Sequence, residues 1–158
     1  MAIYMKYGSI PGSVTTSGFE KWTELTSFQW GVRRGVGSPT STGLSREATE
    51  PTLSEVVVTK EMDVSAPKMF LEGVAGLLNN TVLIKFTTTT KNTVVTFLTY
   101  ELDNTCVSSY SISSGGDLPM ESITLNFTKI IKTFTGMDPG VSGSPESVGY
   151  DLAIRKTT

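Results

Sequence analysis

Apolar and polar residues alternate along most of the chain, which is the pattern of strands with one buried face. Residues 2–7 predict a short first strand. A second strand is predicted from about residue 24 to residue 36. Within it, Phe28, Trp30 and Val32 recur on one face. Large aromatic side chains in this arrangement are typical of a strand that faces a core.

Further strands follow at spacings typical of an antiparallel β fold. They are expected at residues 53–62, 81–90, 93–102, 107–112, 120–134 and 150–155. The pair 81–90 and 93–102 predicts a hairpin about the turn Lys91-Asn92. Seven or eight strands in one chain favour a closed or nearly closed antiparallel barrel, because closure removes exposed sheet edges.

One segment has the periodicity of an α-helix. In residues 65–78 (SAPKMFLEGVAGLL) apolar residues recur at helical spacing, with Phe70, Val74 and Leu77 on one face. Ser65 is suited to cap the N-terminus of this helix. Since apolar residues flank that face on both sides, we expect the helix to be largely buried.

The predicted fold class is therefore all-β with one helix. We expect a single compact antiparallel β-barrel over residues 1–158, with a flanking helix at about 65–78 and a long extended loop at about 37–51. A chain of 158 residues suits one domain. The 18 Ser and 24 Thr agree with this class, because Thr favours strands and Ser favours turns. A two-sheet sandwich is the alternative architecture.

Composition excludes several classes of function. A net charge of −2 offers little to neutralise phosphates, so we expect no nucleic-acid partner. The chain has no His, which removes the usual general base and the commonest zinc ligand. The single Cys106 cannot form an internal disulfide, which fits synthesis in a reducing cytoplasm. No stretch approaches 18 apolar residues, so no membrane insertion is expected, and the start MAIYMKYGSIPG lacks the apolar run of a signal peptide.

No motif predicts catalysis, a cofactor or a metal. Residues 65–68 match S-x-x-K, but the partner motifs of penicillin-binding enzymes are missing and helix capping explains the serine. Gly35-Val36-Gly37 begins like a dinucleotide fingerprint, but no helix follows it. The carboxylates are spread thinly and are interpreted as solvated surface. Trp22 and Trp30 are interpreted as core or interface residues, with a carbohydrate platform as the alternative.

Five segments of the chain form a recognisable set: MAIYMKYGSIPG, LTSFQWGV, VVVTKEMDVSAPKMFLEGVAG, VSSYSISSGGDLPMESITLNFTKI and GYDLAIRK. Taken together they resemble the haemolysin-coregulated protein family, the tube subunit of bacterial type VI secretion systems. They cover most of the chain in the family's order. The chain departs from the family pattern after Gly12 and in the threonine-rich hairpin around residues 87–96.

The resemblance implies a structural protein rather than an enzyme. It implies a homo-hexameric ring, stacking of rings into an exported tube, and effector proteins carried and chaperoned in the lumen. The implied partners are a spike protein at the tube tip and a contractile sheath around the tube. The implied location is the bacterial cytoplasm before firing, followed by secretion through the type VI system without a signal peptide. Two alternatives remain open: a carbohydrate- or ligand-binding β-sandwich module, and a phage-like tail-tube subunit.

The resemblance also assigns roles to two sets of residues. In the family, the face of the second strand opposite Phe28 and Trp30 lines the channel, so the expected lumen and cargo-contacting residues are Ser27, Gln29 and Arg33. The long loop contributes to contacts between stacked rings, so the expected ring-stacking residues are Ser38, Pro39, Leu44, Arg46 and Glu47. Contacts between copies are expected to be polar and wet rather than built on a large hydrophobic patch.

Overall fold

The computed structural model describes residues 1–38, 47–136 and 144–158. It contains one helix and twelve strands within these ranges. In chain order the elements are β1 (Ala2–Tyr7), β2 (Thr23–Leu25), β3 (Ser27–Gln29), β4 (Val32–Arg33), β5 (Thr52–Leu53), β6 (Val56–Glu61), α1 (Ala66–Ala75), β7 (Asn80–Thr90), β8 (Thr93–Ser113), β9 (Met120–Asn126), β10 (Lys129–Phe134), β11 (Glu146–Asp151) and β12 (Lys156–Thr157). The structure confirms a mostly β chain with one helix.

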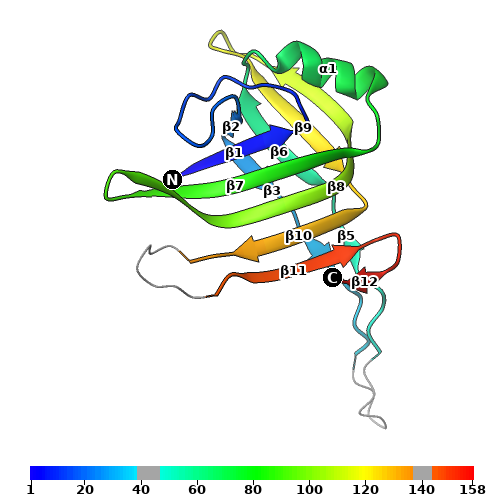
Figure 1. The fold of residues 1–158 in the computed structure, drawn as a ribbon. Coiled ribbons are helices and arrows are strands. Elements are labelled where there is room, and N and C mark those ends of the chain that lie inside the picture. The colour runs from blue at the N-terminus through cyan, green and yellow to red at the C-terminus, as the bar shows by residue number, and fades with distance from the viewer. Residues whose placement is uncertain (39–46, 137–143) are drawn as a thin grey trace.

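Two antiparallel layers share the long strand β8. In the first layer the strand order is β12-β11-β10-β8-β7-β1-β2. In the second layer β3 pairs with β6, β6 with β9, and β9 with the later half of β8. Figure 1 shows the two layers crossing, with α1 at one end of the molecule and β4 and β5 leading away at the other. β4 and β5 form a separate two-stranded ladder.

β8 passes from one layer to the other near Asn104. Asn104 has a φ of 48°, and the register between β7 and β8 shifts at this point. Asparagine adopts this left-handed conformation more readily than most residues, and a shift of this kind bends a strand. The predicted hairpin about Lys91-Asn92 is confirmed, because β7 and β8 pair directly on either side of that turn.

Several predicted strands have other bounds in the structure, and the segment 53–62 divides into β5 and β6. The segment 24–36 divides into β2, β3 and β4, because β2 pairs with β1 whereas β3 pairs with β6. The segment 120–134 divides into β9 and β10 for the same reason: each half joins a different layer. The predicted closing strand at 150–155 overlaps only the end of β11, which stops at Asp151, and the last strand is the short β12. The Asp151 carboxylate accepts a hydrogen bond from the amide of Ala153 (2.8 Å), the side-chain pattern of a turn.

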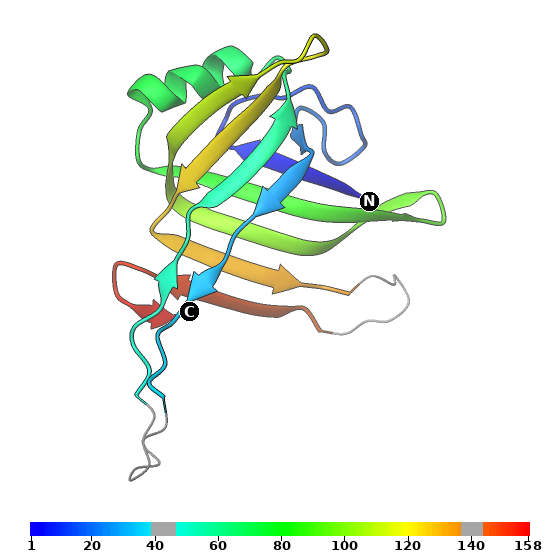
Figure 2. The same cartoon turned by 180° about the vertical axis from the view of Figure 1, so that it is seen from behind.

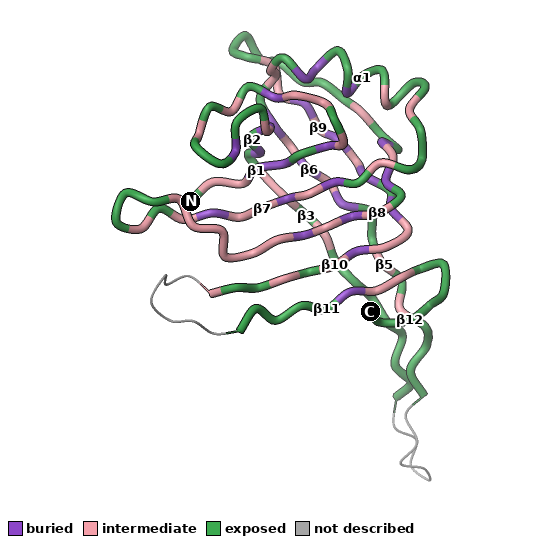
Figure 3. The backbone as a smooth tube through the Cα atoms, viewed as in Figure 1, coloured by how far each residue is buried: buried purple, intermediate pink, exposed green. Residues whose placement is uncertain are grey.

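The prediction that the helix is largely buried is wrong. Only Ala66 and Met69 of α1 are buried, whereas Phe70, Leu71 and Val74 are 58–68% exposed. Its inner side meets β8, where the Phe70 ring lies 6.0 Å from that of Tyr110. The remaining apolar residues of α1 have no covering element in the described chain (Figure 3). No described helix is long and apolar enough to cross a membrane.

The core lies between the two layers. Its fully buried side chains come from both of them and include Val56, Val58, Val82, Ile84, Leu102, Ile123 and Leu125. Phe28 packs on this cluster, with its ring stacked on that of Tyr100 at 4.8 Å and edge-on to that of Phe86 at 5.3 Å. The core therefore fixes the orientation of β3, and with it the face that β3 presents outward.

Candidate assembly surfaces

β3 turns its two polar side chains away from the core. Phe28 and Trp30 pack toward Tyr100, with Trp30 5.8 Å from that ring, so alternation sends Ser27 and Gln29 to the opposite face. Gln29 is exposed, and Ser27 is half-buried because its hydroxyl lies 2.6 Å from the hydroxyl of Thr59 on β6.

Small polar residues continue this outward face across the second layer. Strand pairing places Gln29, Val57, Thr124 and Ser109 in one row, and Ser27, Thr59, Ser122 and Ser111 in the next. We call these eight residues the outward polar face. Val57 is the one apolar member of this face, and none of the eight residues carries a formal charge. Sequence reasoning found only Ser27 and Gln29 on β3, because the residues on β6, β9 and β8 become their neighbours through the register between distant strands.

Arg33 lies in β4 and not in the same sheet as Gln29. It is exposed and is paired with Thr52 of β5. The segment predicted as an extended loop, about residues 37–51, is partly a two-stranded ladder where it joins the body of the molecule. Val36 bridges to Ala48, and the Gly37 amide donates to the Glu47 carbonyl (3.0 Å). We call β4, β5 and the paired residues 36–37 and 47–48 the stem. Figure 2 shows the stem leading away from the body of the molecule.

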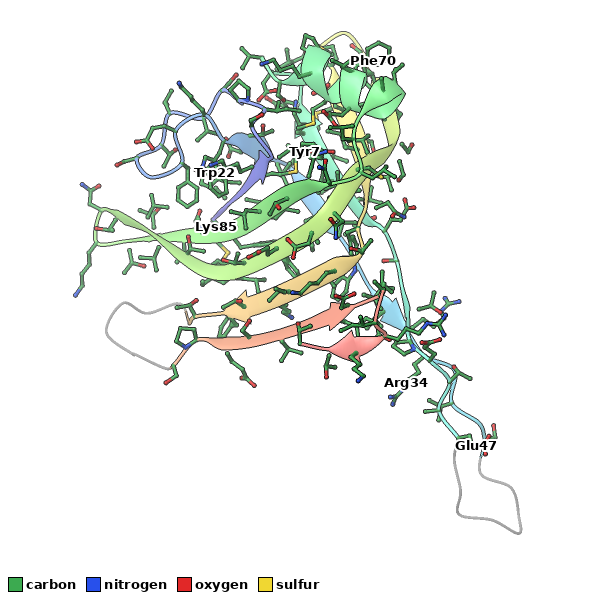
Figure 4. The ribbon with its side chains drawn as sticks, turned by 45° about the vertical axis from the view of Figure 1, so that its right-hand side comes forward. Tyr7, Trp22, Arg34, Glu47, Phe70 and Lys85 are labelled. Carbon is green, nitrogen blue, oxygen red and sulfur yellow. The ribbon has the colours of Figure 1, made fainter. Side chains whose placement is uncertain are left out.

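The structure describes only part of the predicted ring-stacking set. Ser38 and Glu47 are exposed at the far end of the stem. Pro39, Leu44 and Arg46 lie outside the described residues. Figure 4 shows Arg34 and Glu47 along the stem, away from the core. The stem is thus a surface of exposed side chains on paired backbone.

A buried cluster of charged residues joins three strands near the start of α1. Lys60 on β6 and Glu121 on β9 are both completely buried, and the Lys60 ammonium contacts the Glu121 carboxylate. The same ammonium lies 2.9 Å from the carboxylate of Asp63, and the Tyr110 hydroxyl donates to Glu121. Every charge in this cluster therefore has a partner.

The interpretation of the carboxylates as solvated surface is wrong for this cluster. The part of this cluster that is visible in the sequence is the close spacing of Lys60, Asp63 and Ser65 in the segment VVVTKEMDVSAPKMFLEGVAG. Ser65 does not cap the helix with its side chain; its hydroxyl and its amide both donate to Asp63 instead. The Ser65 side chain thus connects the ion cluster to the first turn of α1.

Hydrogen bonds set the pKa values of two carboxyl groups. Burial works to raise the pKa of Asp63, but hydrogen bonds from Ser65 and Lys60 outweigh it, so this pKa lies below its usual value. Hydrogen bonds from the side chains of Ser108 and Asn126 lower the pKa of Glu55. Both shifts favour the charged form of the carboxyl in the folded protein.

These directions predict acid lability. A carboxyl whose pKa is lowered by folding stabilises the protein above its unfolded pKa, about 3.9 for Asp and 4.3 for Glu, and this contribution is lost as pH falls through the folded pKa. We expect the urea midpoint to hold from pH 7 to pH 5 and to fall below about pH 4. The difference in free energy of unfolding between the wild type and Asp63→Asn should become smaller as the pH falls below about 4. A gap of constant size at pH 3 and pH 7 would contradict this, and Asp117→Asn in an exposed turn is the control.

The remaining residues singled out in the sequence have packing environments. The Lys85 ammonium lies 5.3 Å from the ring of Trp22, which packs edge-on against Phe19 (Figure 4). Burial first, and then the Glu55 carboxylate, raise the pKa of the half-buried Cys106 thiol. Such a thiol is mostly protonated at neutral pH and is a poor nucleophile. The described residues contain no group of three or more His, Cys, Asp or Glu side chains that could hold a metal ion.

These features define a structural β protein whose distinctive surfaces are a polar sheet face, a projecting stem and an apolar helix. A family model described as "Type VI secretion system effector, Hcp" matches residues 4–134. The chain belongs to this family, the haemolysin-coregulated proteins. It is accordingly a tube subunit of a type VI secretion system, a structural and secreted protein rather than an enzyme.

Solved structures agree with this assignment. The chain is similar to a type six secretion system protein, with 26% identity, a TM-score of 0.88 and 99% of each chain covered. It is also similar in fold to Hcp1 from Salmonella typhimurium, with 16% identity, a TM-score of 0.75 and 100% of each chain covered. The tube-terminating cap of the anti-feeding prophage shares the fold at 10% identity and a TM-score of 0.58, with 84% of this chain and 87% of that chain covered. Comparison with curated protein sequences finds no match.

Proposed function

We propose that six copies of the chain form a ring whose channel is lined by the outward polar face. The observation that carries this proposal is the run of small, uncharged side chains from Gln29 across β6 and β9 to β8. Such a face keeps a channel open and wet, whereas apolar side chains there would drive its collapse. Gln29 and Ser27 contact cargo, with Arg33 at the margin on β4.

We also propose that the two layers close into a barrel. The strand pairs β1–β2, β3–β6, β6–β9, β9–β8, β8–β7 and β7–β1 form a circuit if β2 and β3 count as one strand. Only Thr26 separates β2 from β3, and its amide donates to the Thr59 carbonyl (2.8 Å). This hydrogen bond supports closure, since it continues the β3–β6 pairing toward β2.

Rings stack into a tube through the stem and the residues beyond it. Ser38 and Glu47 at the end of the stem, together with Pro39, Leu44 and Arg46, contact the neighbouring ring. The stem supports this role because it projects from the body of the molecule on paired backbone (Figure 2). The tube holds effector proteins in its lumen, bears a spike protein at its tip and lies within a contractile sheath. Before firing, the subunit resides in the bacterial cytoplasm.

Substitution of Gln29 tests the assignment of the channel face. A bulky Gln29→Trp side chain, repeated six times around the axis, should narrow the channel and reduce the effector protein that co-purifies with the ring. Because Gln29 is exposed and outside the core, the mass of the ring measured by light scattering should not change. Thr81→Trp, at an exposed position on β7, is the matched control and should retain cargo. Equal retention by both variants would show that β3 does not face the lumen.

A further inference from the structure

One apolar surface that is largely open to solvent in the described chain lies on and just after α1. It consists of Phe70, Leu71, Val74, Leu77 and Leu78, which are 58–70% exposed. We call this surface the α1 ridge. Figure 4 labels Phe70 on this helix; its ring contacts that of Tyr110 but remains 58% exposed. A cluster of large apolar side chains left in water in this way marks an interaction site rather than a random exposure.

The second apolar surface is a groove at the opposite end of the molecule. It is lined on one side by Trp30, Val32 and Leu53 and on the other by Ile130, Val148 and Tyr150, around a cavity of about 210 Å³. We call it the Trp30 groove. It lies where β10 and β11 pass the base of the stem (Figure 1).

The groove continues along a part of the first layer that no described residue covers. Pairing sets Val148 opposite Lys132, Lys132 opposite Tyr100, and Phe134 opposite Leu98, so these side chains share the core-facing side of the layer. Val148 and Phe134 are nevertheless 59% and 49% exposed. The core-facing side of β10 and β11 thus extends beyond the second layer, as their exposed ends in Figure 3 show.

We propose that the α1 ridge of one copy docks in the Trp30 groove of the next copy. This inference rests on the proposed self-assembly and names the two surfaces that meet. A ring or a stack of identical subunits in one direction needs two different surfaces that fit each other. The ridge is convex, the groove is concave and both are apolar. They lie at opposite ends of the molecule, so the ridge of one copy cannot fill the groove of the same copy.

Charge does not decide this pairing, because the groove is lined by the exposed Lys132 and flanked by the exposed Glu146. Lys68 is the exposed charged residue of α1, whose other charged residue, Glu72, is half-buried and accepts hydrogen bonds from Tyr7 and Asn80. Across from Phe134, the groove side carries the exposed Glu146. The exposed apolar residues of the ridge argue against the expectation of purely polar contacts between copies.

Cysteine cross-linking tests the docking directly. In a Cys106→Ala background, Leu77→Cys is placed on the ridge and Val148→Cys in the groove, and a short bismaleimide is the probe. We expect a covalent dimer when the two single variants are mixed, and a ladder when one chain carries both cysteines. A ladder that stops at six copies places the contact within a ring, and a longer one places it between rings. Leu118→Cys, exposed on the loop after β8, replaces Leu77→Cys in the control and should give no ladder.

The outcomes separate this inference from the proposed function. If particles of the wild-type mass form but the Leu77–Val148 pair gives no covalent product, the docking is wrong and the ring proposal stands. If the wild type forms no particles at all, the ring proposal fails and the docking with it. Val74→Asp should abolish particles while far-ultraviolet circular dichroism stays unchanged, because Val74 is 68% exposed, whereas Leu118→Asp should leave particles intact. Particles that persist in Val74→Asp would overturn the docking.

Discussion

Glu121→Ala is expected to lower the free energy of unfolding by about 3–5 kcal/mol, the range for breaking a buried ion pair. The substitution leaves the fully buried Lys60 ammonium with Asp63 as its remaining carboxylate and removes the acceptor of the Tyr110 hydroxyl. Burying a charge or a hydroxyl without its partner costs more than the pair itself contributed. Urea unfolding followed by circular dichroism measures the loss.

Two variants make this result specific to the pair. Glu61→Ala removes the neighbouring exposed carboxylate and should change the free energy of unfolding by less than about 0.5 kcal/mol. The double variant Lys60→Met with Glu121→Leu removes both buried charges and should recover much of the loss, since apolar replacements of a whole pair are often neutral. A loss below about 1 kcal/mol in Glu121→Ala would show that the cluster is hydrated rather than dry.

Trp30→Ala is expected to lower the free energy of unfolding by about 2–3 kcal/mol, somewhat less than the 3–5 kcal/mol typical of a fully buried aromatic residue. Trp30 is half-buried and packs on the core cluster, with its ring against that of Tyr100, so truncation leaves a cavity beside that ring. The same urea titration measures the effect.

Trp30→Phe keeps an aromatic ring at this position and removes the indole N–H, so it distinguishes the contribution of the ring from that of the polar group. The Trp30 indole N–H is buried and has no hydrogen-bond partner among the described residues, so losing it should cost little. We expect Trp30→Phe to retain most of the stability and Gln29→Ala to retain nearly all of it. A stability loss in Gln29→Ala with none in Trp30→Ala would mean that the two faces of β3 are reversed.

The period of apolar residues was sufficient to predict most strands and the inward face of β3. It could not predict where strands change layer, because a strand that switches partners keeps its alternation. The divisions at Thr26 and between Asn126 and Lys129 are of this kind. The pattern did indicate a break between the strands predicted at 93–102 and 107–112, but there β8 runs on as one strand (Thr93–Ser113) that bends near Asn104.

The helix and the ion cluster show a different limit. Apolar periodicity in residues 65–78 predicted a helix with an apolar face, but burial depends on what covers that face, and the described part of the chain leaves most of it exposed. The contact between Lys60 and Glu121 could not be predicted, because their separation along the chain hides the pairing of β6 with β9 that joins them. Local pattern thus predicts elements, whereas pairing between distant elements decides which charges are buried.

The mass of the purified particle tests the central proposal most directly. Light scattering coupled to size exclusion, with negative-stain images of the same fraction, should show rings of about six times the 17.0 kDa of one chain. Images should show a central channel in each ring. A monomer at every concentration, with no rings in the images, would contradict the assignment of this chain as a subunit that assembles into a tube through its own surfaces.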